Sequence, residues 1–387
     1  MKNAVIIDAV RTPIARAHPE KGWFKDIRSD ELGVLVVKEL IRRVGIDPSE
    51  IEDVILGCAT QAGEQAMNVA RYISIMAGLP FESGAQTINR QCASGLAAVN
   101  SAAQAIISGY GEVFIAGGIE SMTHLPEGFG ADLNPRRFDF VDPTAASMGL
   151  AAENLAEMFH ISRRVQEEFA LRSHQKAVAA QREGRFKQEI VPVEIVESDG
   201  SRRLVDSDQN PRPYTSLELM AAFEPIARPD GTITSATASF ASDGAAAVML
   251  MSSEKAKALG FRSGARIRSM AVAGVDPKIT GFGAVAAARK ALARAGLTPE
   301  DIDIAEINEA FAVVAIVCQR ELGLSEEKVN PNGGAVALGH PMGCSGAKLV
   351  TALFHEMRRR KARFGLVTVG VGMGQGEATV LERIDLS

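Results

Sequence analysis

Cys92 is the residue of this sequence whose type and setting best suit covalent chemistry. The segment Gln86 to Gly95 reads Gln-Thr-Ile-Asn-Arg-Gln-Cys-Ala-Ser-Gly and leads from a predicted strand into a helix of small residues, Leu96 to Ser108. A thiol at this turn lies in the field of the helix N-terminus, which favours the nucleophilic thiolate over the thiol. On these residues alone, a buried structural cysteine is an equally good interpretation.

A second glycine-rich turn carries a histidine. His340 lies between Gly339 and Pro341, within the segment Asn330 to Gly346. An imidazole on such a rigid loop is suited to removing a thiol proton or to donating a hydrogen bond to a thioester oxygen. The alternative interpretation is a histidine with a structural role.

Two further segments offer polar groups to a site. Asn308 follows a predicted strand, and its side chain can orient a water molecule or cap a helix, so both interpretations stay open. The segment Gly370 to Gly376 alternates glycines and precedes a strand-like stretch, so it does not match the G-x-G-x-x-G motif of dinucleotide sites. Alternating glycines expose backbone N–H groups, as an oxyanion hole requires.

An internal repeat predicts how these turns come together. Lys38 to Glu52 parallels Arg289 to Asp303 at an offset of 251 residues (289 − 38), and the same offset relates Ser94-Gly95 to Ser345-Gly346. Each copy predicts a helix, a Gly-x-x-Pro turn, a short strand and a glycine-rich turn that opens another helix. The repeat therefore predicts two similar α/β halves with helix-covered sheets. A pseudo-twofold axis between them would bring the two glycine-rich turns close together.

The repeat also divides the chain into domains. We expect residues 1–120 to form the N-terminal half, 121–243 an inserted loop domain, 244–262 a return to the N-terminal half, and 263–387 the C-terminal half. Insertions of this size between core elements often form a binding lid.

Composition limits the functional classes. The 42 Lys and Arg residues are balanced by 47 Asp and Glu residues without a basic stripe, which argues against nucleic acid as a partner. Local arginines, Arg202-Arg203 or Arg212, could still bind an anionic ligand, although solvated loop arginines are the alternative.

The four cysteines form no C-x-x-C pair and no histidine spacing completes a zinc site, so free thiols and no metal are expected. Because no apolar run suits a signal peptide or approaches ~20 residues, we predict a cytoplasmic protein without membrane insertion.

Taken together, the segments resemble the thiolase family over essentially the whole chain. The matching segments are Val10-Arg-Thr-Pro13, Asn89-Arg-Gln-Cys-Ala-Ser-Gly95, Gly117-Gly-Ile-Glu-Ser-Met122, Met148-Gly149, Asn308-Glu-Ala-Phe311, Gly339-His-Pro341 and Gly374-Gln-Gly376. Each segment alone is weak, but their order along the chain is highly specific. The resemblance implies a thiolase fold, in which two repeated, helix-covered mixed sheets form a five-layered core with an inserted loop domain.

The resemblance also implies an activity and the residues that carry it. The activity is thiolytic cleavage of a 3-ketoacyl-CoA to acyl-CoA and acetyl-CoA, or the reverse Claisen condensation, with coenzyme A as a substrate and no cofactor. Cys92 would be the acylated nucleophile and His340 its activator. Asn308 with His340 would form one oxyanion hole, and the backbone N–H groups of Cys92 and Gly372 the other.

Further implications concern binding and assembly. Ser239 matches a family position that contacts the pantetheine arm of coenzyme A, and Met148 matches a residue near the acyl pocket. Family members are commonly homodimers or homotetramers, and some join a hydratase–dehydrogenase partner subunit.

The sequence departs from the family pattern at one catalytic position. Thiolases typically have Cys-x-Gly-x-Gly-Gln-Gly near the C-terminus, and here Gly370 stands where that cysteine is expected. The family cysteine exchanges the proton of acetyl-CoA in the carbon–carbon step, and such a group contributes typically ~10²–10⁴-fold to a rate. We therefore expect acylation of Cys92 to survive better than the carbon–carbon step. Cys344, four residues after His340, is a candidate substitute for the missing thiol.

Two alternatives stay open. One is a non-catalytic CoA-binding subunit with the thiolase fold, in which Gly370 marks lost chemistry. The other is a related condensing enzyme such as a ketoacyl synthase, which uses a cysteine with two histidines or with histidine and asparagine. The Gly-Gln-Gly ending and the long insertion favour a thiolase over a ketoacyl synthase.

Overall fold

The computed structural model describes residues 2–126, 132–197 and 199–386. Its strands are β1 (Ala4–Arg11), β2 (Ala15–Arg16), β3 (Asp53–Gly57), β4 (Gly84–Ile88), β5 (Val113–Glu120), β6 (Val193–Val196), β7 (Arg202–Val205), β8 (Ser242–Ser252), β9 (Ser263–Gly274), β10 (Ile304–Ile307), β11 (Phe364–Val371) and β12 (Gln375–Asp385). Its α-helices are α1 (Ser29–Val44), α2 (Val69–Met76), α3 (Ser94–Ser108), α4 (Met148–Met158), α5 (Arg163–Arg182), α6 (Leu217–Ala221), α7 (Ser253–Ala258), α8 (Gly283–Ala295), α9 (Ala312–Glu321), α10 (Ala335–Leu338) and α11 (Met342–Arg360).

The strands form two mixed half-sheets that join into one. The order is β10-β11-β12-β9-β1-β8-β5-β3-β4. Strand β3 runs parallel to β4 and β5, and β10 runs parallel to β11, while the other pairs along this order are antiparallel. The halves meet where β1 pairs with β9 at Val5–Arg266 and Ile6–Ala265.

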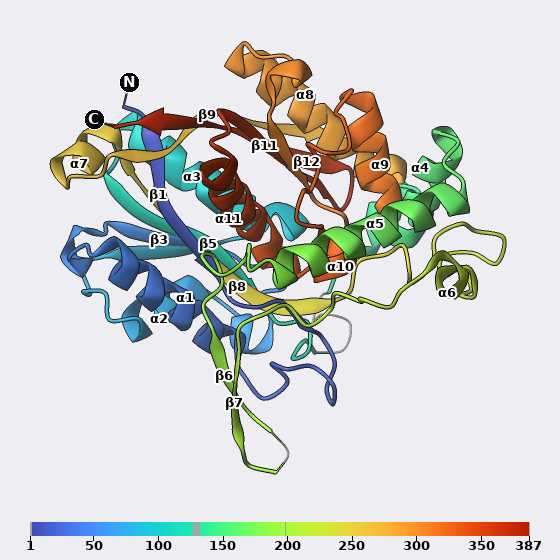
Figure 1. The fold of residues 1–387 in the computed structure, drawn as a ribbon, viewed down its shortest axis with the longest axis horizontal. Coiled ribbons are helices and arrows are strands. Elements are labelled where there is room, and N and C mark those ends of the chain that lie inside the picture. The colour runs from blue at the N-terminus through green and yellow to red at the C-terminus, as the bar shows by residue number, and fades with distance from the viewer. Residues whose placement is uncertain (1, 127–131, 198, 387) are drawn as a thin grey trace.

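Helices cover both half-sheets and also separate them. Helices α3 and α11 share one hydrophobic core with strands of both halves, and Figure 1 shows them in the middle of the molecule. The outer face of the N-terminal half packs against α1 and α2, and that of the C-terminal half packs against α8 and α9. The layers therefore run helix, sheet, helix, sheet, helix, which confirms the predicted five-layered α/β fold.

The sequence repeat is a structural repeat. Helices α1 and α8 end at Gly45 and Gly296, which share the left-handed conformation with the same φ of 68°. Strands β3 and β10 start 251 residues apart (304 − 53), as do β5 and β11 (364 − 113). The predicted pseudo-symmetric halves are thus confirmed.

The central helices α3 and α11 approach each other at their first turns through glycines. A Cβ built on Gly95 would lie 2.7 Å from the Ala347 nitrogen and 2.8 Å from the Gly343 carbonyl oxygen. A Cβ built on Gly346 would lie 2.2 Å from the Leu96 nitrogen. Only glycine permits this approach, and it brings the turns that precede the two helices to the same place.

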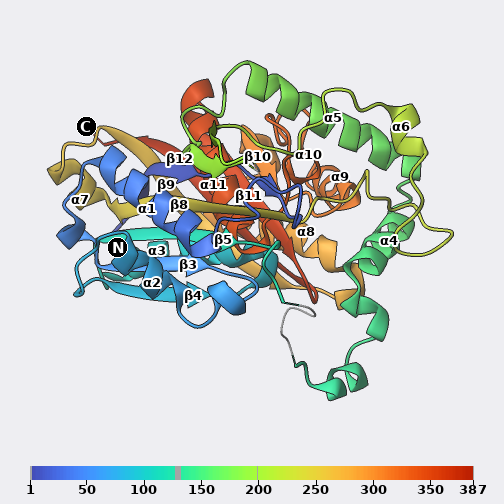
Figure 2. The same ribbon diagram turned by 90° about the horizontal axis from the view of Figure 1, so that it is seen from below.

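The described residues between β5 and β8 add no strand to the large sheet. Helices α4, α5 and α6 gather over the C-terminal half, as Figure 2 shows, and the β6–β7 hairpin projects from the body. Buried Arg11 ties this segment to β1, because its guanidinium pairs with Asp208 at 2.7 Å and with Glu189 at 2.8 Å. The domain boundaries stay a prediction, and residues 127–131 and 198 of the expected insertion lie outside the described ranges.

No helix within the described ranges is long and apolar enough to cross a bilayer.

Candidate active site

Cys92 lies in a tight turn whose geometry is fixed by polar neighbours. A 3₁₀ turn, Gln91–Ala93, precedes α3, and Gln91 has a positive φ of 45°, which is uncommon for a residue with a side chain. The Asn89 Oδ1 atom accepts a hydrogen bond from the Gln91 N–H at 2.8 Å. The Ser94 hydroxyl accepts from the Arg90 N–H at 2.9 Å and donates to the Gln91 carbonyl at 2.7 Å. These bonds compensate the strained backbone and direct the thiol.

The Cys92 thiol is protonated at neutral pH. Burial is the main cause that raises its pKa to about 11; the backbone N–H of Gly372 opposes the rise, the carboxylate of Glu120 adds to it, and the N–H of Cys92 opposes it. Desolvation of the charge therefore opposes the field of the helix terminus in the free protein, and the expected thiolate stays a prediction. The nearby N–H groups of Gly372 and Cys92 nevertheless match the predicted pair of oxyanion donors.

His340 is a neutral base with a defined tautomer. Its Nδ1 atom lies 2.6 Å from the Ser345 hydroxyl oxygen, and that hydroxyl donates its one hydrogen to the Pro341 carbonyl at 2.9 Å. A proton on Nδ1 and a lone pair on Nε2 satisfy both this contact and the Asn308 Nδ2 atom, which lies 3.4 Å from Nε2. Burial and, to a smaller extent, the ammonium of Lys348 lower the pKa of His340 to about 4.

The two turns adjoin, but the thiol and the imidazole are not hydrogen-bonded to each other. Among the described residues, no hydrogen bond joins the Cys92 sulfur to His340. The 3₁₀ turn that holds Cys92 packs against α11, which begins two residues after His340. Proton transfer between them therefore needs a bridging water or the closer approach that bound substrate brings.

Asn308 faces His340 and does not cap a helix. Its Nδ2 atom lies 3.4 Å from His340 Nε2, and helix α9 begins four residues later without a side-chain cap. The adjacent Glu309 fixes the turn, because its carboxylate accepts from Ser173 at 2.8 Å and from Asn330 at 2.7 Å. Of the two interpretations of Asn308, the geometry favours the site residue.

Gly372 and Met148 lie beside the nucleophile turn. A Cβ built on Gly372 would lie 2.1 Å from Gln91 Oε1 and 3.7 Å from Met148 Sδ. A side chain at position 372 would displace the end of the Gln91 side chain, and the Met148 thioether lies on the same side of residue 372.

Gly370 differs from Gly372, because its position has room for a side chain. The three atoms nearest to a Cβ built on it all belong to the backbone of Gly281, at 3.3–3.7 Å. Small shifts of Gly281 would accommodate such a Cβ.

Ser239 lies on a segment that links the Asn308 turn to the His340 turn. The Ser239 N–H donates to the Ala310 carbonyl at 3.0 Å, and the Phe240 carbonyl accepts from the His340 N–H at 2.9 Å. These two hydrogen bonds hold the half-buried Ser239 next to two of the predicted site segments.

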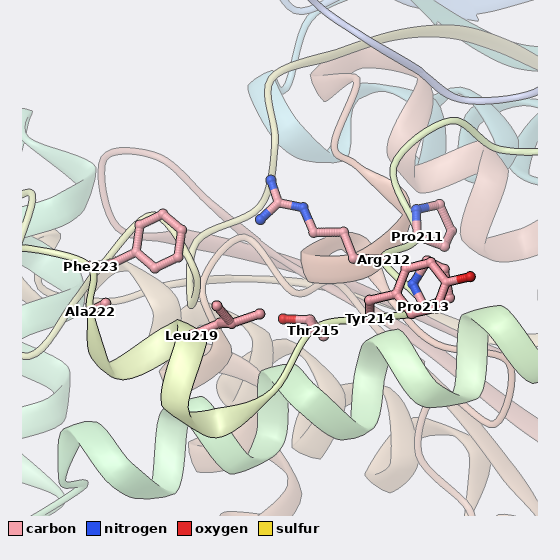
Figure 3. A pocket seen from close by; sticks show the side chains of 8 residues that line it. All are labelled: Pro211, Arg212, Pro213, Tyr214, Thr215, Leu219, Ala222 and Phe223. Carbon is pink, nitrogen blue, oxygen red and sulfur yellow. The ribbon is translucent and has the colours of Figure 1, made fainter.

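An apolar cavity of about 570 Å³ adjoins this segment. It is lined by Pro211, Arg212, Pro213, Tyr214, Thr215, Leu219, Ala222 and Phe223. Figure 3 shows the side chains from Pro211–Thr215 on one side and those from the region of α6 on the other. The Arg212 guanidinium stacks on the Phe240 ring at 4.5 Å, and that of Arg16 lies 5.4 Å from the same ring.

The arginines singled out in the sequence therefore separate into two kinds. Arg202 and Arg203 form ion pairs with Glu194 and Glu197 on the exposed β6–β7 hairpin, as solvated loop arginines do. Arg212 lines a cavity, as an anion-binding residue would.

Cys344 lies in a small buried cluster, and its substitution for a thiol at position 370 stays a prediction. It is fully buried, and its neighbours in the core are Ala246 and Ala347. Burial raises its pKa to about 12. Cys58 and Cys318 lie in the outer cores of the two halves.

Sequence reasoning missed the residues that tune His340. Ser345 fixes its tautomer, and buried Lys348 favours its neutral form. The repeat contained a signal for Ser345, because its counterpart Ser94 secures the nucleophile turn in the other half. Nothing in the sequence pattern indicated that Lys348 is only 3% exposed.

The fold and these turns define an α/β protein with a duplicated core and a thiol at the entry of a central helix. Two family models match the chain, "Thiolase, N-terminal domain" over residues 4–254 and "Thiolase, C-terminal domain" over residues 261–383. The chain therefore belongs to the thiolase family.

Relatives match over nearly the full length. A 3-ketoacyl-CoA thiolase of Shewanella loihica is 49% identical, and the match covers 99% of this chain and 100% of the relative. A 3-ketoacyl-CoA thiolase of Aeromonas salmonicida is 47% identical at the same coverages. The solved structure of the Bacillus anthracis acetyl-CoA acetyltransferase superposes with a TM-score of 0.91 at 40% identity, covering 99% of both chains.

Proposed function

We propose that this protein is an acyltransferase that cleaves 3-ketoacyl-CoA with coenzyme A, or runs the reverse condensation, through an acyl group on Cys92. Two contacts at Cys92 carry the proposal. The backbone N–H groups of Gly372 and Cys92 interact with the Cys92 sulfur, and the Cys92 turn packs against α11, the helix that follows His340. The names of the full-length relatives from Shewanella and Aeromonas support the same reaction.

In the acylation step, His340 Nε2 takes the proton of the Cys92 thiol as the sulfur attacks the carbonyl carbon. Both groups are neutral in the free protein, so the proton moves only as the new bond forms. The N–H groups of Cys92 and Gly372 stabilise the negative oxygen that develops. The Asn308 side chain and the protonated His340 then face the oxygen of the second thioester.

We further propose that the cavity at Arg212 binds coenzyme A, which acts as substrate and not as a resident cofactor. The lining is mainly apolar, with Arg212, Tyr214 and Thr215 as its polar side chains, and the guanidinium groups of Arg16 and Arg212 beside Phe240 suit phosphate oxygens. Ser239 precedes Phe240, which stacks with Arg212 and accepts a hydrogen bond from the His340 N–H, so Ser239 would contact the pantetheine arm and Met148 the acyl group.

Gly370 would impair the carbon–carbon step and spare acylation. The acylating groups come from other positions, and Gly372 contributes its backbone N–H alone. Restoring a thiol by Gly370→Cys should raise cleavage and condensation by about 10²–10⁴-fold, the usual contribution of an acid–base group.

A homodimer through β4 is part of the proposal. Strand β4 ends the sheet order, and apolar side chains near it are exposed, with Met67 at 77%, Tyr72 at 55% and Phe81 at 76%. An open strand edge beside apolar side chains suits pairing with a second copy. Sedimentation of the parent and of a Tyr72→Asp variant tests this, with dissociation of the variant expected. A tetramer, a hydratase–dehydrogenase partner and a cytoplasmic location stay predictions.

Intact-protein mass measurement after incubation with acetyl-CoA tests the central claim. We expect one acetyl group, located on Cys92, that free coenzyme A removes. Cys92→Ala should abolish the adduct, whereas the matched variant Cys344→Ala should retain it. CoA binding with no adduct on an accessible, reduced Cys92 would instead support a non-catalytic subunit.

A further inference from the structure

We propose that a second, polar cavity binds a small phosphorylated compound that is rich in hydroxyl groups, of the sugar phosphate class. The cavity has a volume of about 650 Å³. It is lined by Glu183, Gly184, Arg185, Lys187, Gln188, Glu189, Asn332, Ala352, His355, Glu356, Arg358 and Arg359. These residues differ throughout from those that line the cavity at Arg212. The proposal is independent of the acyl chemistry at Cys92.

The cavity lies where the end of α5 meets the end of α11. Residues 183–189 follow α5, and residues 352–359 belong to the last turns of α11. Asn332 connects the two, because its amide donates to Glu356 at 3.0 Å and its oxygen accepts from Arg185 at 3.0 Å. Asn332 is 5% exposed and Glu356 is 2% exposed. A ligand therefore meets polar groups that the fold already holds in place.

The charges of the lining favour an anion. Each lining carboxylate already has an arginine partner: Glu183 pairs with Arg185, Glu189 with Arg11, and Glu356 with Arg359 and Arg360. Within the part of the chain that the structure describes, Lys187 and Arg358 form no ion pair, and Arg358 only stacks on the Phe354 ring at 5.4 Å. Two cations without a counter-charge border one cavity, and a phosphate group offers several oxygens to both.

His355 provides a second, independent observation. It is 8% exposed, and its Nε2 atom lies 2.8 Å from the Ala9 carbonyl oxygen, so Nε2 carries a proton. Its Nδ1 atom is buried and has no hydrogen-bond partner in the described structure. A buried polar atom without a partner destabilises a protein, and native structures rarely keep one without a reason. Because the His355 side chain lines the cavity, a ligand hydroxyl that donates to Nδ1 would supply the missing partner.

The remaining lining residues indicate what accompanies the phosphate. Of the lining residues, only Ala352 has an apolar side chain, so an acyl chain would gain little from entering. A nucleobase would find no phenylalanine, tyrosine or tryptophan to stack on. The lining carboxylates and the Gln188 amide can instead accept hydrogen bonds from hydroxyl groups. A phosphate on a hydroxylated carbon chain matches both the cations and these acceptors.

The test is calorimetric titration of the full chain with ribose 5-phosphate, with inorganic phosphate and with ribose. The phosphate serves the two free cations, and the hydroxyl groups serve His355 and the acceptors. We therefore expect ribose 5-phosphate to bind with a Kd of about 1 mM or tighter, and at least about 10-fold more tightly than either part alone.

Variants show where the compound binds. Lys187→Gln and Arg358→Gln each remove one free cation from the exposed part of the lining, so each should weaken binding of ribose 5-phosphate by about 5-fold. Lys257→Gln is the matched control, because Lys257 is an exposed lysine outside the cavity and should leave binding unchanged. Arg212→Gln should also leave it unchanged, since Arg212 lines the other cavity.

Three results would overturn the inference. The first is absence of binding at about 10 mM ribose 5-phosphate. The second is binding that is unaffected in Lys187→Gln and Arg358→Gln, or that is lost in Arg212→Gln. The third is inorganic phosphate binding as tightly as ribose 5-phosphate, because the hydroxyl groups would then contribute nothing. None of these results bears on acetylation of Cys92, so the proposed function is tested separately.

Discussion

Cys92 should react slowly with an alkylating reagent near neutral pH, because its thiol and the nearby imidazole of His340 are both uncharged. With a pKa of about 11, about one Cys92 in 1,000 is ionised at pH 8, whereas an ordinary thiol of pKa ~8.5 is about one quarter ionised. The ionised fraction is thus about 250-fold smaller. A more basic thiolate is also a better nucleophile, by about 10-fold for this pKa difference. Alkylation of Cys92 should therefore be slower than that of an exposed cysteine by roughly 20-fold at pH 8.

The measurement is the rate of iodoacetamide incorporation at Cys92, followed by peptide mass spectrometry from about pH 7 to about pH 10. The rate should rise about 10-fold per pH unit across this range, because the thiolate fraction does so below the pKa. His340→Ala should leave this slope unchanged, since an imidazole with a pKa of about 4 carries no charge here. A rate that is independent of pH near neutrality, and that loses this plateau in His340→Ala, would reveal a thiolate–imidazolium pair and refute the reasoning.

Three further predictions concern the supports of the site. Ser345→Ala leaves the His340 Nδ1 proton without its acceptor, so acylation of Cys92 by acetyl-CoA should slow by about 10–100-fold while the alkylation slope is unchanged; an acylation rate equal to the parent's would contradict the tautomer argument. Gly95→Ala places a Cβ 2.7 Å from the Ala347 nitrogen, so urea unfolding should show a loss of about 1–3 kcal/mol, and unchanged stability would mean that α3 and α11 separate freely. Arg11→Met leaves the carboxylates of Glu189 and Asp208 buried without their cation, so the free energy of unfolding in urea should fall by about 3–5 kcal/mol. An unchanged free energy of unfolding would show that these ion pairs do not hold the insertion.

The architecture was predictable because the repeat imposes register. Two helix, turn and strand units at one offset required two similar half-sheets. The close approach of α3 and α11 at Gly95 and Gly346 became visible only in the structure. The meeting of the Cys92 and His340 turns followed from that symmetry alone. The short strand predicted after each Gly-x-x-Pro turn is present as β3 in one half and β10 in the other.

The electrostatics of the site were not predictable from the same patterns. The helix terminus next to Cys92 was visible in the sequence, whereas the desolvation that opposes it depends on packing between segments far apart in the chain. The same holds for Lys348, because a buried lysine in a helix looks like a solvated one until the opposite wall is known. Arg212 became a candidate for coenzyme A only when its cavity and Phe240 were in place.

Acylation of Cys92 and the carbon–carbon step can be separated because they use groups from different positions. The acylation groups are the thiol of Cys92, the imidazole of His340 and backbone N–H groups, and none of them requires a side chain at position 370. The turn between β11 and β12 contributes the N–H of Gly372, and a residue at position 370 leaves that N–H in place as long as the pairing of Gly370 with Gly376 is kept. A change at position 370 therefore acts on the carbon nucleophile and not on the acyl group. For this reason the ratio of the rate of carbon–carbon bond formation to the rate of acetyl transfer from Cys92 to coenzyme A, measured on one acylated enzyme, isolates the effect of Gly370 from that of the acylating groups.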